Sequence, residues 1–150
     1  MAGTIFDTSI YINSLRKADP SIFNQKRIVS GKSEKSENEP LYLSAVVLEE
    51  LYVGAGSGRM KKLLSRFERE FEKINRLLVP NQTDWTICGQ VLSMIGKKHG
   101  FEQVKHARMT NDCLIAMTTA RFGLTVITHN AKDFKIINEF RPFKGSEIKS

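Results

Sequence analysis

Hydrophobic residues along this chain fall into two patterns: short apolar runs, and longer stretches in which they recur at helical spacing. Residues 59–76 form the clearest helical stretch, because apolar residues recur every three or four positions among charged ones. Residues 114–122 are almost wholly apolar, which predicts a helix that is buried on more than one side. The short runs have the length and composition of buried strands, and they are residues 4–6, 41–43, 77–79 and 124–127.

Polar residues and glycines beside these stretches predict where the helices begin and end. Ser44 is a plausible N-cap for a helix over residues 45–55. The polar residues 110–112 stand where the buried helix is expected to begin, and Gly123, which is free to adopt a positive φ, is expected to end it. Two further helices are predicted, over residues 10–15 before Pro20 and from Thr83 or Asp84, as N-cap, to His99.

The alternation of short strands with amphipathic helices predicts an α/β fold with a mainly parallel central sheet. The chain has 150 residues and no internal repeat, so it is expected to form a single domain over residues 1–150. Residues 30–40 are charged and serine-rich, and they are predicted to be a mobile loop that serves as a solvated connector.

Composition and charge narrow the classes of function. A net charge of +7 and a pI near 9.5 favour an anionic partner, of which nucleic acid is the commonest. The two cysteines, Cys88 and Cys113, lack metal-ligand spacing, which argues against a zinc site or a disulfide framework. No signal peptide and no membrane-spanning run is recognised, so a cytoplasmic protein without a membrane partner is expected.

Acidic residues occur at four places where a surface role explains them poorly. Asp7 follows a strand, Glu49 and Glu50 lie in an apolar helix, Asp112 opens the buried helix, and Asp133 follows the last strand. If these carboxylates converge, each raises the pKa of the others, and a pair about 4 Å apart costs roughly 4 kcal/mol at an effective dielectric of 20. A bound cation would compensate this repulsion, and oxygen ligands select Mg²⁺ or Mn²⁺. Metal-bound water attacking a phosphodiester is the chemistry that such a site and a basic chain suggest.

Each acid also has a simpler interpretation. Asp7 and Asp112 are also suited to be N-caps, and Asp133 to be a surface residue of a final helix. Neighbours on a helix diverge by about 100°, so only one of Glu49 and Glu50 can face a site. Periodicity leaves that choice open, although Glu49 lies nearer the apolar stripe of the helix.

Four segments, in order along nearly the whole chain, carry a resemblance to a known family. They are IFDTSIYI at residues 5–12, LSAVVLEELYVG at 43–54, NDCLIA at 111–116 and VITHNAKDF at 126–134. Together they resemble the PIN-domain family and, within it, the VapC-like toxins of bacterial toxin–antitoxin pairs. Each segment alone is a weak signal, whereas four in the expected order are specific.

The resemblance implies a role for each position that matches the family pattern. Asp7 and Asp112 resemble the first and third metal-binding acids, and the residues around the second acid select Glu50 over Glu49. Asn130 occupies the fourth position, which departs from a four-acid site. The remaining candidates are Asp133, as a substitute for the fourth acid, and Thr8, Ser9 and Thr128, as polar residues that hold the acids or a metal-bound water.

By the same resemblance, the fold would be a Rossmann-like three-layer α/β/α sandwich. The activity would be that of a Mg²⁺-dependent endoribonuclease, with Mn²⁺ as a possible replacement, that acts on RNA as the toxin of a pair. Its partners would be a cognate antitoxin and a second copy of the chain in a homodimer. The apolar face of residues 59–76 is a candidate wall of the antitoxin groove.

Three alternatives remain at this stage. A haloacid-dehalogenase-like phosphotransferase needs a second acid two residues after the first, where this chain has Ser9. A receiver-like domain expects paired acids after the first strand, where Asp7 is alone. A weak or inactive PIN-type module for RNA binding or assembly stays open because Asn130 carries no charge at the fourth position.

A basic run precedes Asp112 in the sequence. It either lines a path for RNA, because phosphate contacts dominate salt-sensitive affinity, or simply ends a helix and continues as an exposed loop. Its members are Lys97, Lys98, His99, Lys105, His106 and Arg108.

Overall fold

A computed structural model describes residues 3–17, 20–23 and 40–148 of the chain. All of the loop predicted over residues 30–40, except Pro40, lies outside the described residues, so that prediction is untested. The described elements, in order, are β1 (Thr4–Phe6), α1 (Thr8–Arg16), the 3₁₀ helix η1 (Pro20–Phe23), β2 (Leu41–Ser44), α3 (Ala45–Val53), α4 (Gly58–Lys73), β3 (Leu77–Leu78), α5 (Gln82–His99), α6 (Ala107–Arg121), β4 (Thr125–Thr128), α7 (Lys132–Phe140) and β5 (Lys144–Glu147).

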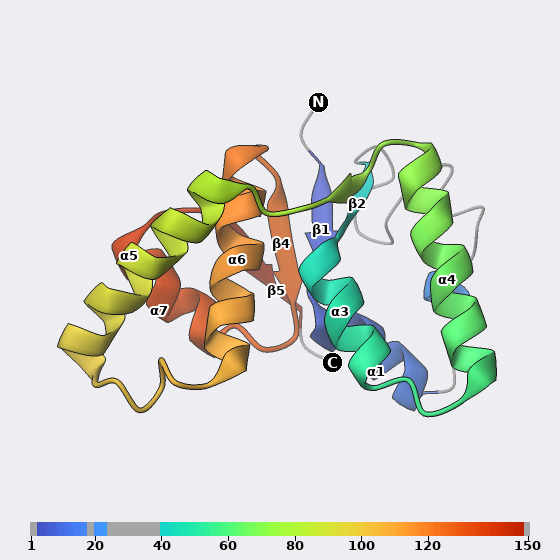
Figure 1. The fold of residues 1–150 in the computed structure, drawn as a ribbon, viewed down its shortest axis with the longest axis horizontal. Helices are drawn as coiled ribbons and strands as arrows, with labels where there is room; N and C mark the ends of the chain where they lie inside the picture. The colour runs from blue at the N-terminus through green and yellow to red at the C-terminus, as the bar shows by residue number, and fades with distance from the viewer. Residues whose placement is uncertain (1–2, 18–19, 24–39, 149–150) are drawn as a thin grey trace.

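The five strands form one sheet in the order β3-β2-β1-β4-β5, and every neighbouring pair is parallel. Helices α5, α6 and α7 lie together beside β4 and β5, α4 lies beyond β2, and α1 and α3 lie between these groups (Figure 1). The predicted α/β/α architecture with a parallel sheet is therefore confirmed. Since β2 and β3 extend the sheet on one side of β1 while β4 and β5 extend it on the other, the strand order reverses between β1 and β4. Such a switch point is where ligands bind in open parallel sheets.

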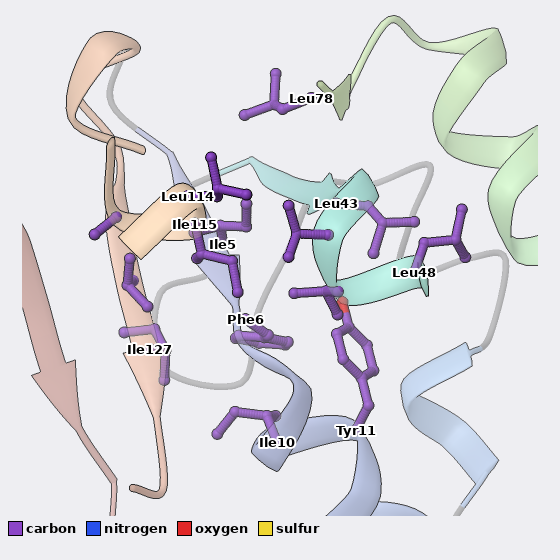
Figure 2. Packing of buried hydrophobic residues seen from close by; sticks show 14 of the residues in the cluster. Ile5, Phe6, Ile10, Tyr11, Leu43, Leu48, Leu78, Leu114, Ile115 and Ile127 are labelled. Carbon is purple, nitrogen blue, oxygen red and sulfur yellow. The ribbon is translucent and has the colours of Figure 1, made fainter. Parts of the chain in front are cut away.

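The core explains why the apolar runs become buried strands and helix faces. Ile5 of β1 is fully buried, and Figure 2 shows it among Leu43 of β2 and Leu114 and Ile115 of α6. These contacts bring together segments more than 100 residues apart, which local propensity alone does not do. An aromatic cluster extends the core towards α4, through edge-on contacts of Tyr11, Phe67 and Phe71 and a tilted contact of Tyr11 with Phe23.

Some boundaries differ from those that the sequence predicts. The helix predicted to begin at residues 110–112 begins at Ala107, with His106 at the N-cap position but without a capping bond from its side chain. Met109 is buried and extends the apolar face of α6 by one turn. Strand β5, whose four residues are all exposed, has no apolar signal and was not predicted. In the described part of the chain, no helix combines the length and the apolar character needed to cross a membrane.

An ion pair between a buried carboxylate and an exposed arginine joins the start of α5 to the end of α6. Asp84, which was predicted as a possible N-cap, instead forms a capping box with the N-cap residue Asn81. Its carboxylate is almost fully buried and accepts bonds from Arg121 Nη2 at 2.9 Å and Nε at 3.1 Å. Arg121 also donates to the carbonyl of Val79 at 3.2 Å, so it fixes the loop before α5 as well.

We expect Arg121→Ala to lower the free energy of unfolding by about 2 kcal/mol, because it removes the hydrogen bonds of a buried carboxylate to its cation. Urea denaturation at pH 7 measures this change. Lys73→Ala is the matched control, since it removes the exposed partner of Glu70, and surface pairs contribute less than about 1 kcal/mol. Equal effects of the two substitutions would show that the Asp84–Arg121 pair is not what holds α5 to α6.

Candidate functional site

Asp7 lies at the reversal of strand order, directly after β1 and beside the end of β4. Its side chain caps α1 by accepting a bond from the backbone N–H of Ser9 at 3.0 Å. The hydroxyl of Ser9 donates to Oδ1 of Asp7 at 2.5 Å, and the hydroxyl of Thr128 donates to Oδ2 at 2.7 Å. The capping role that was considered as an alternative is therefore present, and it coexists with a fixed orientation of the carboxylate towards the site.

The same two hydroxyl groups tie the loop after β4 to Asp7. Ser9 Oγ accepts a bond from the backbone N–H of His129 at 2.9 Å, and Thr128 Oγ1 accepts one from the N–H of Asn130 at 2.9 Å. Each hydroxyl thus donates to the acid and accepts from the loop. Thr128 and Ser9, which the sequence predicts as supporting residues, thus both donate hydrogen bonds to Asp7.

Glu50 reaches the site from α3. The hydroxyl of Thr8 donates to Oε1 of Glu50 at 2.6 Å, which places this carboxylate one residue along α1 from Asp7. Glu49 lines the same cavity but is exposed, and in the described part of the chain it forms no hydrogen bond. The geometry favours Glu50 over Glu49, in agreement with the family pattern.

Asp112 lies on α6, facing the same region. This residue is only 7% exposed, although a carboxyl group with an ordinary pKa is charged at neutral pH. Because α6 begins at Ala107, Asp112 lies in the second turn, and its interpretation as an N-cap is wrong. Capping of a helix end therefore does not explain why Asp112 is buried.

The two buried acids, Asp112 and Asp7, differ in how their surroundings shift their pKa values. The pKa of Asp112 is raised to about 8, first by burial and then by the negative charges of Asp7, Asp133 and Glu50, while Arg108 opposes the shift. Burial also raises the pKa of Asp7, but the bonds from Ser9 and Thr128 counteract it by stabilising the ionised form. Without a cation, Asp112 is the acid that holds a proton near neutral pH.

The last two candidates lie after β4. Asn130 is exposed and lines the cavity. Asp133 lies in the first turn of α7, half-buried, and is not among the residues that line the cavity, although its charge acts on Asp112. Asn130 therefore lines the cavity, whereas Asp133 acts on Asp112 through its charge.

An open cavity of about 660 Å³ lies among helices α1, α3 and α6 and the loop after β4. Its lining residues include Asp7, Glu50 and Asp112. In Figure 1, α1 and the first turn of α6 lie at the same end of the sheet. No three His, Cys, Asp or Glu side chains in the described ranges converge closely enough to form a ready-made metal site. Mg²⁺ nevertheless fits the donor set, because it keeps several waters and needs only one or two carboxylates, as Asp7 and Asp112 provide.

The basic run predicted from the sequence is divided by the structure. Arg108 lines the cavity, whereas Lys98 and His99 contact Glu139 of α7 at 2.7 and 3.3 Å. Arg16 also lines the cavity and was missed by the sequence interpretation. Its signal is the helical spacing that places Arg16 on the face of α1 that carries Ser9.

The chain has a parallel sheet, and acidic residues lie where the strand order of this sheet reverses. These two features define a class of α/β proteins with a polar, anionic site at the switch point. The PIN domain family model matches residues 4–139, which is most of the chain. The chain belongs to the PIN-domain family.

Solved structures agree with this fold. DNA-bound VapBC from Salmonella typhimurium is 20% identical, with a TM-score of 0.65 over 98% of both chains. VapBC-1 from nontypeable Haemophilus influenzae is 24% identical, with a TM-score of 0.60 over 96% of both chains. FitAcB from Neisseria gonorrhoeae is 22% identical, with a TM-score of 0.59 over 95% of both chains. A comparison with curated protein sequences found no match.

We expect Asp112→Asn to stabilise the metal-free protein at alkaline pH. The folded pKa of Asp112 is raised from 3.8 to about 8, so wild-type stability is complete below pH 4 and is lost as the pH rises towards 8. The amide has no such loss, so at pH 8.5 with a chelator the variant should melt about 5 °C or more above the wild type, with a smaller difference at pH 5.

Thermal melts across this pH range measure the effect. Glu49→Gln is the control, because it neutralises an exposed carboxylate in the same cavity. Parallel melting curves for wild type and Asp112→Asn at all pH values would contradict the raised pKa.

Proposed function

We propose that this protein is a Mg²⁺-dependent endoribonuclease that acts as the toxin of a toxin–antitoxin pair. The observation that carries the proposal is the buried carboxylate of Asp112, which shares an open cavity with Asp7 and Glu50. A fold that buries acids together pays a cost that a cation relieves. The net charge of +7 suits a polyanionic substrate such as RNA.

In this proposal, each residue of the site has its own role. Asp7 and Asp112 would hold the divalent cation, which when bound would supply Lewis-acid stabilisation of the phosphate and a water of lowered pKa. Ser9 and Thr128 keep both oxygens of Asp7 in place through the bonds at 2.5 and 2.7 Å. Glu50 is oriented by Thr8 through Oε1, which leaves Oε2 without a partner among the described residues and able to accept a proton from the attacking water.

Asn130 lowers the negative charge at the cavity relative to a site with four acids. An amide oxygen remains able to orient a water or the cation, while three carboxylates keep the charge needed for Mg²⁺. The alternative of an inactive RNA-binding or assembly module rests on this same neutral residue. A haloacid-dehalogenase-like reaction is disfavoured, because Ser9 donates its hydroxyl proton to Asp7 where that chemistry needs an acid.

The proposed protein partners are an antitoxin and a second copy of the chain. The similar structures include VapBC and FitAB assemblies. A second groove of about 490 Å³, with Leu15, Met60 and Leu64 in its wall, lies between α1, α3 and α4 and is suited to an apolar antitoxin segment. This groove shares Ile12, Arg16 and Glu50 with the acidic cavity, so an occupant of the groove would be close to the site.

We expect Asp7→Asn and Asp112→Asn each to lower RNA cleavage by more than about 100-fold in Mg²⁺, because even residues behind metal ligands contribute 10- to 100-fold. Cleavage of a labelled RNA by the purified, antitoxin-free protein measures the rate. Glu102→Gln, an exposed acid after α5, is the control and should cleave as the wild type does. Unchanged cleavage in both aspartate variants would contradict the proposed metal site.

Glu50→Gln should lower cleavage far more than Glu49→Gln, by about 100-fold against less than about threefold, because general-base catalysis contributes 10²- to 10⁴-fold. The two residues are neighbours of equal charge, so each is the matched control of the other. A larger loss in Glu49→Gln would assign the catalytic role to the exposed side chain and contradict the geometry.

A further inference from the structure

Two arginines stand at the edge of the acidic cavity. Arg16 lies at the end of α1 and Arg108 in the first turn of α6, and both are exposed. They are the only lysines or arginines among the described residues that line the cavity. The cavity therefore has acids at its buried floor and cations at its rim.

Neither guanidinium is paired within the described part of the chain. Among the described residues, no carboxylate lies within 4.0 Å of Arg16 or Arg108, whereas Arg121 pairs with Asp84 at 2.9 Å and Lys98 with Glu139 at 2.7 Å. The charge of Arg108 still acts on Asp112, which places it close to the floor of the cavity. Within the described part of the chain, both guanidinium groups can therefore bind an external anion. Phosphate is an anion that a guanidinium group binds in bidentate fashion.

A polyanion needs these cations in order to enter. Carboxylates at the floor repel phosphate, so attraction must come from the rim of the cavity. Arg16 and Arg108 come from different helices, α1 and α6, and both line the cavity that Asp7 and Asp112 also line. A strand that lies in the cavity would therefore meet one guanidinium from each of these two helices.

We propose that Arg16 and Arg108 bind the phosphates that flank the cleaved one and so hold a single RNA strand across the acidic floor. This assignment rests on the proposed ribonuclease function. It moves the RNA path away from Lys97 and Lys98 at the end of α5, which do not line the cavity. The path instead runs from the end of α1 to the start of α6.

The test is equilibrium binding of a fluorescently labelled single-stranded RNA, measured by anisotropy in a chelator so that no cleavage occurs. Arg16→Ala and Arg108→Ala should each raise Kd about tenfold, as expected for a lost charge-assisted bond. Each should also lower the slope of log affinity against log salt by about 0.7, and the double variant by about 1.4. Lys97→Ala, which removes an exposed cation away from the cavity, should leave both quantities unchanged.

Two further readouts separate phosphate binding from a structural role. Arg→Lys at either position should keep the salt slope but weaken binding, because lysine retains the charge and lacks the fork. In Mg²⁺, the alanine variants should raise KM and leave kcat within about twofold, since they lose ground-state and transition-state binding equally. A fall in kcat with KM unchanged would overturn the assignment.

The outcomes distinguish this inference from the proposed function. If RNA is cleaved and both alanine variants bind it as tightly as the wild type, with the same salt slope, the arginine assignment is overturned and the nuclease remains. If binding depends on both arginines but no RNA is cleaved, the assignment of the arginines to RNA phosphates holds and the nuclease function fails. An absence of any RNA binding by the wild type overturns the assignment.

Discussion

The burial of like charges at one point of the sheet is the constraint on which the rest of this structure depends. Asp7 and Asp112 are each less than 10% exposed, and Glu50 shares their cavity. Two carboxylates about 4 Å apart cost roughly 4 kcal/mol at an effective dielectric of 20. The fold meets this cost by protonating Asp112, whose pKa rises to about 8, and a cation would meet it by replacing that proton.

The surrounding architecture serves to keep the acids in place. Strands β1 and β4 are neighbours in register, with Phe6 opposite Ile127, so the residues that follow them meet at one edge. Ser9 and Thr128 then fix Asp7, and Thr8 fixes Glu50, through hydroxyl bonds of 2.5 to 2.7 Å. Each hydroxyl group donates to a different oxygen. Among the described residues, the other partners of Ser9 Oγ and Thr128 Oγ1 are each other and the backbone N–H groups of the loop after β4.

The sequence was sufficient for the fold class, since hydrophobic periodicity and four ordered segments carry that information. It also named Asp7, Glu50, Asp112 and Asn130, which line one cavity in the structure. It was insufficient where long-range contacts decide. The choice of Glu50 depends on Thr8, 42 residues away. The start of α6 was misplaced because His106 offers no capping side chain, and β5 was missed because an exposed edge strand has no apolar pattern. The catalytic and metal-binding roles of the site residues stay predictions.

Calorimetric titration of Mg²⁺ into the metal-free protein at pH 7, in two buffers of different ionisation enthalpy, tests the central claim most directly. It counts the protons released when the cation binds. Since the pKa of Asp112 is about 8, close to one proton per ion should leave the wild type and almost none should leave Asp112→Asn. Binding without proton release in the wild type, or no binding of Mg²⁺ or Mn²⁺ at millimolar concentration, would contradict the account.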